Sequence, residues 1–161
     1  MNEDPADTTS GITILRRMSA EDVPRLCELE QQIFPDPWPH QAFFEQLQGD
    51  EWGGFVAENN GIVTGYACYY LSPPEAHLTN IAIDPEWRRK SIAKRLLECV
   101  FEVVQEAPCE FLLLEVRSSN DGAIAFYERH EFRELYRRKN YYRRPVEDAL
   151  VMVKYFDLSE Q

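Results

Sequence analysis

The sequence predicts an α/β (α+β) fold, with a mixed central sheet of about seven strands flanked by about four helices. Three observations support this prediction. Segments typical of strands and helices follow one another in the order β, α, α, β, β, β, α, β, α, β, β. The dipeptide Asn60-Gly61 separates two β-rich runs, as in a tight hairpin. Residues 92–104 carry apolar side chains at helical spacing, so a helix connects two of the strands and makes them parallel neighbours.

The first third of the chain is predicted to hold one strand and two helices. Residues 12–17 (ITILRR) are typical of a strand. A helix over residues 19–34 begins at Ser19, with Asp22 three positions on as a variant of the capping box. The segment PDPWP ends this helix, and residues 40–48 form a second, shorter one.

The remainder alternates between strands and helices. Residues 110–116 (EFLLLEV) contain a continuous apolar run, which predicts a strand buried on both faces. A helix over residues 118–130 is capped by Ser119 or Asn120. The other expected elements are the hairpin 54–71, the strands 76–83, 132–138 and 148–156, and the helix 91–107.

Length and composition indicate one globular domain. The chain has 161 residues, of which 44% are hydrophobic and 12% aromatic. This is enough for one domain with a core and too short for two. We expect the domain to span residues 12–156, with a flexible N-terminal tail at residues 1–11 and a C-terminal tail at residues 157–161.

The charge is unevenly distributed. The net charge is -11, and residues 1–80 hold 13 acidic but only 3 basic residues. A nucleic-acid-binding protein would normally be basic, so no direct nucleic-acid partner is expected. The acidic half suits a cationic partner, or it serves solubility alone; both readings stay open.

Cysteine usage and the absence of targeting patterns indicate a cytoplasmic protein. The four cysteines are widely spaced, with apolar neighbours and no C-x-x-C pair, which predicts free thiols in a reducing compartment. The three histidines are scattered, so no metal is expected. No apolar run approaches the roughly 18 residues of a membrane span. The first eleven residues lack the features of a signal peptide.

Residues 88–97 (RRKSIAKRLL) have the layout of a phosphate site. A strand leads through an Asp-Pro turn and a short loop into the start of a helix, where unsatisfied N–H groups and the helix dipole attract anions. Ser91 and Ala93 are small enough to let a diphosphate approach the backbone. The alternative is a helix start whose cations simply face water.

At this loop the sequence resembles the GNAT N-acetyltransferases. Arg88, Ser91 and Ala93 occupy the places of the family's acetyl-CoA signature, which reads Gln or Arg, two residues, Gly, one residue, Gly or Ala. The surrounding segments resemble the bacterial RimI type, which acetylates the N-terminal amine of a small-subunit ribosomal protein. These segments are NIAIDPEWRRKSIAKRLL, LLLEVRSSNDGAIAFYERHEF, RRKNYY, EDALVM and FPDPWP. The resemblance covers about residues 12–156.

The resemblance implies a GNAT fold with a splayed strand pair that holds acetyl-CoA as co-substrate, without a metal. Ile81, Ala82 and Ile83 would bond the pantetheine arm through their backbone. Asn120 would bond the cofactor near the following helix, although it could simply cap that helix. The pyrophosphate would lie on the loop and helix start, at Arg88, Arg89, Lys90, Ser91, Ile92, Ala93 and Lys94.

The resemblance also implies a catalytic pair, with Glu115 as general base and Tyr127 as general acid. An α-amine with a pKa of about 7.7 to 8 must lose a proton to a base before it attacks a thioester. The departing thiolate must then receive a proton from an acid. Four apolar residues precede Glu115, so burial could favour its protonated form. The plainer alternatives are an ion pair between Glu115 and Arg117, and a core position for Tyr127.

The acceptor groove is also implied by the resemblance. Tyr141 and Tyr142 would line the peptide groove, with Trp38 on the opposite wall or packed on the core. The mixture of cations and aromatics in residues 137–144 could alternatively be a nucleic-acid patch. We expect a monomer or weak dimer.

Two residues depart from the family pattern. Ser91 and Glu131 stand where the family has glycines. A positive φ at either position would cost a residue with a side chain about 1 kcal/mol. The hydroxyl of Ser91 could instead cap the helix or donate to phosphate.

The leading hypothesis is acetyl transfer from acetyl-CoA to the N-terminal α-amine of a protein, a ribosomal protein in the RimI type, by direct attack in a ternary complex. A small amine or a lysine ε-amine is the alternative acceptor. A GNAT-like partner-binding module that has lost catalysis is the alternative of another class.

Overall fold

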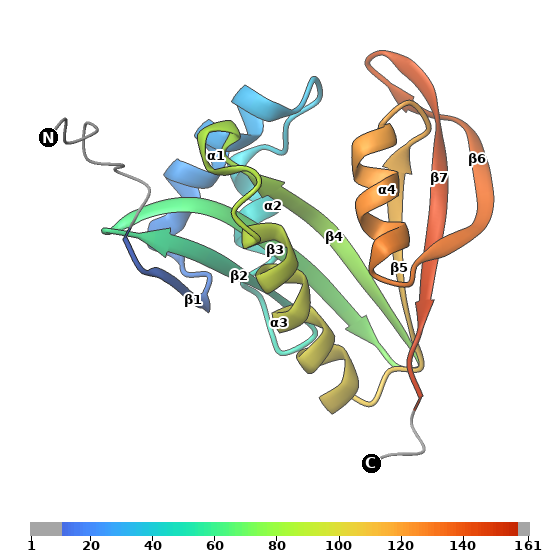
Figure 1. Ribbon diagram of the computed structural model, residues 1–161, viewed down its shortest axis with the longest axis horizontal. Helices are drawn as coiled ribbons and strands as arrows, with labels where there is room; N and C mark the ends of the chain where they lie inside the picture. The colour runs from blue at the N-terminus through green and yellow to red at the C-terminus, as the bar shows by residue number, and fades with distance from the viewer. Residues whose placement is uncertain (1–10, 158–161) are drawn as a thin grey trace, which may run out of the picture.

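The computed structural model describes residues 11–157 and has a mixed seven-stranded sheet with helices on both faces (Figure 1). The predicted order of strands and helices is confirmed. The expected tails lie outside the described residues, apart from Gly11 and Asp157. The strands are β1 (Thr13–Arg17), β2 (Trp52–Asn59), β3 (Ile62–Ser72), β4 (Glu75–Ile83), β5 (Phe111–Arg117), β6 (Arg133–Arg143) and β7 (Val146–Tyr155). The helices are α1 (Val23–Ile33), α2 (His40–Glu45), α3 (Ile92–Glu106) and α4 (Asp121–Arg129), with 3-10 turns at Ala20–Asp22 and Pro85–Trp87.

The sheet opens between its fourth and fifth strands. Its order is β1-β2-β3-β4-β5-β7-β6, and β4 and β5 are the one parallel pair among the strands described. This parallel ladder pairs Glu75–His77 with residues 111–113 only, after which the two strands diverge (Figure 1). Beyond His77, one edge of β4 has no partner strand within residues 11–157. The expected splayed strand pair is therefore confirmed.

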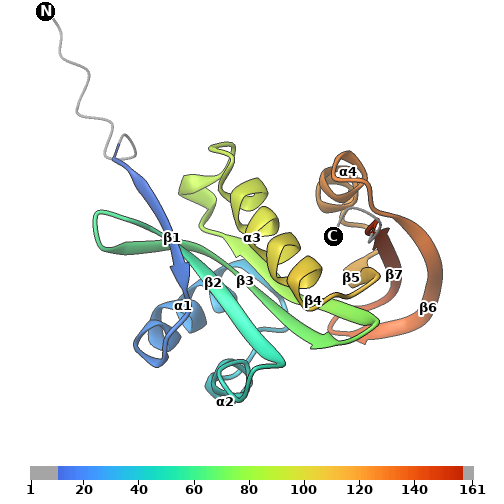
Figure 2. The ribbon, with the colours of Figure 1, turned by 90° about the horizontal axis from the view of Figure 1, so that it is seen from below.

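The helices divide between the two faces of the sheet. Helices α1 and α2 lie on one face, and α3 and α4 lie on the other (Figure 2). Each face has its own hydrophobic cluster. One cluster contains Val23, Leu26, Phe43 and Tyr66, and the other contains Leu96, Leu97, Val100, Leu114, Val116 and Tyr127. The apolar face predicted for α3 thus packs on the sheet.

The turn between β2 and β3 follows the sequence prediction. Asn60 and Gly61 both have positive φ, at 50° and 80°, as a two-residue hairpin turn requires. The prediction for β5 is wrong in one respect. Leu112, Leu114 and Val116 are buried, but Glu115 between them is exposed, so this strand is covered on one face only. An apolar run alone does not reveal that the second face lacks a covering helix.

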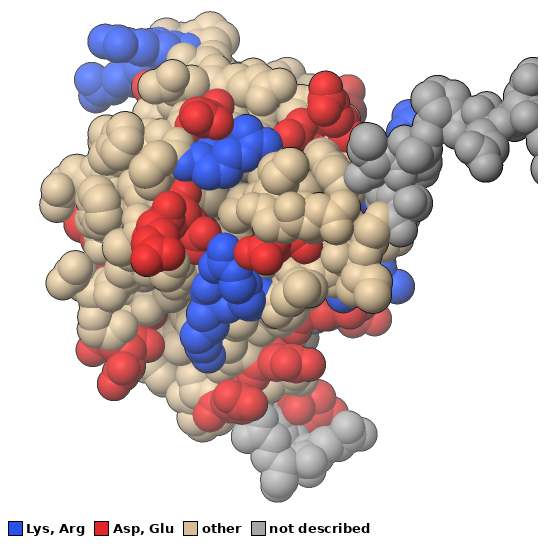
Figure 3. Space-filling model, turned by 90° about the vertical axis from the view of Figure 1, so that its left-hand side faces the viewer, with Lys and Arg blue, Asp and Glu red and all other residues tan. Residues whose placement is uncertain are grey.

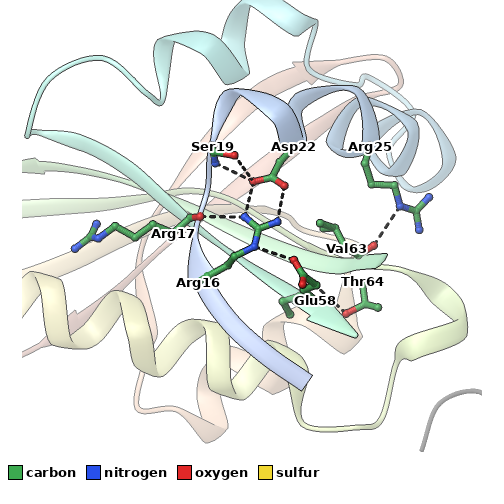
Figure 4. A network of polar contacts seen from close by, with 9 residues as sticks. Arg16, Arg17, Ser19, Asp22, Arg25, Glu58, Val63 and Thr64 are labelled. Atoms are coloured by element: carbon green, nitrogen blue, oxygen red, sulfur yellow. Dashed lines mark hydrogen bonds and ion pairs between the residues drawn. The ribbon is translucent and has the colours of Figure 1, made fainter. Parts of the chain in front are cut away.

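The entrance to α1 is held by a polar network (Figure 4). The backbone N–H of Ser19 donates to Asp22 Oδ2 at 2.8 Å, which is the contact expected of the capping-box variant. Arg16 donates to both oxygens of Asp22, at 2.9 and 2.8 Å, and its Nε donates to Glu58 at 2.8 Å. The predicted helix over residues 19–34 is in fact a 3-10 turn followed by α1.

The charged side chains do not gather in one region of the surface seen in Figure 3. On this face, acidic and basic side chains are interspersed, and neither sign forms a continuous field.

All four cysteines are free, and Cys27, Cys68 and Cys109 are buried. Among the helices described, none has the length and hydropathy needed to cross a bilayer. Residues 11–157 contain no group of His, Cys, Asp and Glu suited to a metal ion.

Candidate functional site

A cleft of about 940 Å³ lies where β4 and β5 diverge. The residues that line it come from the segment between α1 and α2, from both diverging strands, from the start of α3, from α4 and from β6. Of the predicted site residues, Trp38, Ile81, Ala82, Ile83, Arg88, Ala93, Glu115, Asn120, Tyr127 and Tyr142 line the cleft. Arg89, Lys90, Ser91, Ile92, Lys94 and Tyr141 do not.

The loop before α3 has the backbone of an anion site. Arg89 and Ser91 are left-handed, with φ of 64° and 60°, and the residue between them is not. Alternation of handedness turns successive N–H groups into one concavity, a nest that binds anions. This nest opens directly into the N-terminus of the 15-residue helix α3. The side chain of Ile92 is buried in the core and anchors the helix start, so the role expected of this residue is that of its backbone N–H.

These features fit acetyl-CoA. The unpaired edge of β4 offers backbone N–H and C=O groups to an extended amide chain. The nest and helix start offer N–H groups to a diphosphate, and the cationic side chain of Arg88 faces the same cleft. The donor set therefore matches a long molecule with an amide arm at one end and phosphates at the other.

Asn120 caps α4, as one of the two sequence readings expected. Its Oδ1 accepts the backbone N–H of Ala123 at 3.2 Å. The residue also lines the cleft, so its amide NH₂ group remains available to a ligand.

Glu115 and Tyr127 lie on opposite sides of β5. Leu114 and Val116 belong to the core cluster that also contains Tyr127. Because side chains alternate along a strand, Glu115 points to the other face of the sheet, on which α1 packs against β3 and β4 and leaves β5 uncovered. The cleft thus passes through the sheet, with the carboxylate on one side and the phenol on the other.

The partner of Glu115 is a cation of β6. Arg138 Nε lies 3.4 Å from Glu115 Oε1, and about a third of the Glu115 side chain is exposed. The alternative pairing with Arg117 is wrong, because Arg117 bonds Glu147 at 3.3 Å and stacks over Tyr142. The expected burial of Glu115 is also wrong, for the reason given for β5.

Tyr127 is buried, with 7% of its surface exposed. Its ring packs edge-on against Phe126 and Phe132, so the reading as a core aromatic holds beside its position in the cleft. Burial first, and then the neighbouring Tyr142, raise the pKa of Tyr127 above its ordinary value. The hydroxyl therefore keeps its proton at physiological pH.

Aromatic residues from two sides flank the carboxylate. Trp38 packs against Phe43, with ring centroids 5.3 Å apart, and also lines the cleft. The packing on the core is therefore confirmed, and the contact with an acceptor peptide stays a prediction. Tyr141 and Tyr142 stack edge to face at 5.2 Å on the opposite side. A hydrogen bond to Glu115 is the main cause that raises the pKa of Tyr141, and burial raises the pKa of Tyr142 to about 12.

The positive φ considered for the two departures is confirmed. Ser91 has φ of 60°, and its hydroxyl makes no capping bond to the helix. Glu131 has φ of 70° and lies just past α4, where Phe132 N–H bonds back to Tyr127 O at 3.0 Å. The carboxylate of Glu131 accepts Lys154 Nζ at 2.9 Å, and this bond lowers the pKa of Glu131.

Three residues beside the cleft were not predicted from the sequence. Glu30 and Asn80 line the cleft, and Arg138 pairs with Glu115. A signal for Glu30 existed in the sequence. It lies four residues after Leu26 and three before Ile33, on the apolar face of α1, where a charged side chain is unusual.

Comparison with known proteins places this architecture among the acetyltransferases. The sequence profile described as the acetyltransferase (GNAT) family matches residues 23–132. The chain is similar to [ribosomal protein bS18]-alanine N-acetyltransferase from Escherichia coli (strain K12), with 34% identity over 139 residues, which cover 84% of this chain and 92% of that protein. It is equally similar to N-alpha-acetyltransferase RimI from Mycobacterium tuberculosis (strain H37Rv), with 34% identity over 141 residues, or 84% of this chain and 87% of that protein.

A solved structure has the same fold. The crystal structure of the ribosomal-protein-S18-alanine N-acetyltransferase from Escherichia coli superimposes with a TM-score of 0.84 and 31% identity. The match covers 92% of this chain and 96% of that one. Ard1 from Thermoplasma volcanium, at 22% identity and a TM-score of 0.85, shares the fold.

Proposed function

Because the chain belongs to the acetyltransferase (GNAT) family, we propose that its cleft transfers an acetyl group to the N-terminal α-amine of a small-subunit ribosomal protein. The chain is an acetyl-CoA-dependent N-acetyltransferase. The Escherichia coli relative at 34% identity is named a [ribosomal protein bS18]-alanine N-acetyltransferase, and the match covers 92% of it. This supports the same protein, bS18, as the acceptor here. We further propose that residues 12–156 act as a single domain in the cytoplasm.

The observation that carries the residue assignment is the two-sided cleft. Glu115 and Tyr127 approach it from opposite faces of β5. An acceptor amine can therefore enter from the face of α1 and α2 while the co-substrate occupies the face of α3 and α4. Direct transfer in a ternary complex needs this separation, because the base must reach the attacking nitrogen and the acid must reach the leaving group on the far side.

Glu115 is the proposed general base. A peptide α-amine with a pKa of about 7.7 to 8.0 is largely protonated at neutral pH, so it must give up a proton before it can act as a nucleophile. The carboxylate of Glu115 accepts that proton, directly or through a water. Acetyl-CoA supplies the thioester carbon that the amine attacks. Backbone N–H groups on the unpaired edge of β4 are positioned to stabilise negative charge on the carbonyl oxygen.

Tyr127 is the proposed general acid. Its raised pKa keeps the phenol protonated, so it can donate the proton that the departing sulfur requires. Burial also fixes its ring between Phe126 and Phe132, which limits the positions that the hydroxyl can take.

The remaining predicted residues have binding roles in this proposal. Ile81, Ala82 and Ile83 bond the amide arm of acetyl-CoA through their backbone, and Asn120 bonds it from the start of α4. Trp38, Tyr141 and Tyr142 flank the path of the acceptor peptide. The pyrophosphate lies on the nest and helix start, which comprise Arg88, Arg89, Lys90, Ser91, Ile92, Ala93 and Lys94.

The test is acetylation of a peptide that carries the N-terminus of bS18, followed by mass spectrometry. We expect one acetyl group on the α-amine, and none on the same peptide with a blocked N-terminus. A lysine-containing blocked peptide and a polyamine test the alternative acceptors. Glu115→Gln and Tyr127→Phe should each reduce kcat by about a hundredfold or more. Full activity in both variants would overturn the residue assignment, whereas modification of the blocked peptide would overturn the choice of acceptor.

A further inference from the structure

A buried carboxylate lies beside the acceptor side of the cleft. Glu30 of α1 is 1% exposed, and its carboxylate accepts hydrogen bonds from three neutral donors in the part of the chain that the structure describes. The hydroxyl of Tyr66 donates to Oε1 at 2.5 Å, and Nδ2 of Asn80 donates to the same oxygen. The backbone N–H of Trp38 donates to Oε2 at 2.9 Å. One carboxylate therefore joins β3, β4 and the segment between α1 and α2.

The carboxylate fixes the orientation of Asn80. Asn80 Nδ2 donates to Glu30 Oε1, so the NH₂ end of the amide faces Glu30 and the amide oxygen faces away. Within residues 11–157, Asn80 Oδ1 has no hydrogen-bond donor, and it is not among the buried atoms that lack a partner. It is therefore accessible, and Asn80 lines the cleft. The cleft receives a hydrogen-bond acceptor at this position.

A β-bulge brings Asn80 to this side of the sheet. The pairing of β3 with β4 shifts between Cys68 and Tyr69, so that Tyr69 opposes Leu78 while Cys68 opposes Asn80. The extra residue, Thr79, reverses which side chains face which side. Leu78 lies in the core cluster of α3 and α4, whereas Ala82, two residues beyond Asn80, lies in the cluster of α1 and α2. Without the bulge, Asn80 would face away from Glu30.

The same carboxylate holds the wall that carries Trp38. The segment between α1 and α2 contains three prolines, at positions 35, 37 and 39, and prolines have no N–H to bond. The bond from Trp38 N–H to Glu30 is thus one of few ways to attach this segment to the helix before it. The position of Trp38 and the orientation of Asn80 depend on one group.

We propose that Glu30 is a positioning residue for the acceptor: it holds the Trp38 segment in place and directs Asn80 Oδ1 into the cleft, where this oxygen accepts a hydrogen bond from an N–H of the acceptor peptide. The inference rests on the proposed function, because it assumes a peptide acceptor on the face of α1 and α2. Glu30 does not touch the reacting atoms; it acts through Asn80 and Trp38.

The kinetic test is Glu30→Gln. The glutamine keeps the shape of Glu30 but replaces one of its two acceptor oxygens with an NH₂ donor. Asn80 and Trp38 bond different oxygens of Glu30, so the glutamine can accept from only one of them. We expect the KM for the bS18 peptide to rise about tenfold, as for the loss of one hydrogen bond of about 1.4 kcal/mol. The kcat and the KM for acetyl-CoA should stay within about twofold of wild type. Glu28→Gln is the matched control, since Glu28 is exposed on the same helix and its ion pair within residues 11–157 is with Arg25.

A second variant keeps the test open if Glu30→Gln does not fold. Asn80→Ala removes the proposed acceptor at a partly exposed position and should raise the peptide KM by a similar factor. The double variant should be no worse than the stronger single variant, because both remove the same contact. Independent additive effects on the peptide KM would overturn the claim that Glu30 acts through Asn80.

Amide hydrogen exchange gives a readout that does not depend on activity. Exchange at the Trp38 N–H should be faster in Glu30→Gln than in wild type or Glu28→Gln, and unchanged exchange would overturn the proposed hold on this segment. If the wild type is active and Glu30→Gln has the same peptide KM as wild type, this inference is overturned while the proposed function stands. A wild type that acetylates no N-terminal peptide would overturn the proposed function, and the peptide contact with it.

Discussion

Arg138 Nε lies 3.4 Å from Glu115 Oε1, so a cation of the edge strand β6 contacts the carboxylate that we assign as the general base. About half of the Arg138 side chain is exposed, and its guanidinium lies 5.4 Å from the Tyr141 ring centroid. The ion pair places a cation where the ammonium group of an acceptor would approach the same carboxylate. Because Arg138 is exposed, it can also turn away when a cationic amine approaches the same carboxylate.

The first prediction concerns the ion pair between Arg138 and Glu115. Arg138 competes with the ammonium group of the acceptor for the same carboxylate, so in Arg138→Gln the KM for the peptide should fall about two- to fivefold, as for a partly exposed ion pair. Steady-state kinetics with varied peptide measures this KM. Arg137→Gln is the control, since Arg137 pairs with Glu134 and Asp148 instead. An unchanged peptide KM would show that Arg138 does not influence binding at the base.

The second prediction concerns the dependence of kcat on pH on the alkaline side. Burial raises the pKa of Tyr127, so this phenol stays protonated above the ordinary tyrosine value of 10 and would lose its proton only at still higher pH. Ionisation of Tyr127 should therefore cause no decrease in the kcat of the wild-type enzyme at any pH up to 10. The measurement is kcat at saturating substrates from pH 7 to pH 10. A descending limb in that range that disappears in Tyr127→Phe would contradict the prediction.

The third prediction concerns the strained residue at the start of α3. Ser91 adopts φ of 60° without a compensating side-chain bond to the helix. Ser91→Gly should raise stability by about 1 kcal/mol, the penalty of the left-handed conformation. For a chain of this size this corresponds to about 2–4 °C in Tm, measurable by calorimetry. Ser91→Ala is the matched control, because it removes the hydroxyl but keeps the Cβ, and it should give no gain.

The same variant addresses the phosphate site. The proposed contacts come from backbone N–H groups, and the loop already has the left-handed residues that the nest requires. Ser91→Gly should therefore change the Kd for acetyl-CoA by less than about threefold. A change of this size is smaller than the effect of gaining or losing one contact. A much larger gain in affinity would show that the serine side chain obstructs the site.

Features set by neighbouring residues could be predicted from the sequence. The Asn60-Gly61 turn and the apolar face of α3 depend on short stretches of chain, and the structure confirms both. The positive φ at Ser91 and Glu131 could be considered only because the resembled family has glycines there, since a residue with a side chain disfavours this conformation. Local preferences act on the backbone wherever the segment is placed in the fold.

Features that depend on strand pairing could not be predicted. Arg138 meets Glu115 only because β7 lies between β5 and β6, and the β6–β7 pairing contains two irregularities. Asn80 meets Glu30 because of a bulge in the middle of β4. The bulge in β4 and the first irregularity of β6 each shift the pairing by one residue, and the second irregularity of β6 shifts it by two. No pattern in a single strand reveals these shifts.

The last prediction concerns the network at the entrance to α1 (Figure 4). Burial tends to raise the pKa of Asp22, but hydrogen bonds from Arg16 and Ser19 outweigh it and lower the pKa below 3.8. A carboxyl with a depressed pKa in the folded state contributes stability that is present above its unfolded pKa and is lost as the pH falls through the folded value. Asp22→Asn should therefore cost about 1–3 kcal/mol at pH 7, and this cost should shrink below pH 3.8. Urea denaturation at pH 7 and at a pH below 3.8 measures the free energy of unfolding of the variant and of wild type. Asp50→Asn, at an exposed position, is the control. An equal cost at both pH values would mean that the charge of Asp22 does not stabilise the fold.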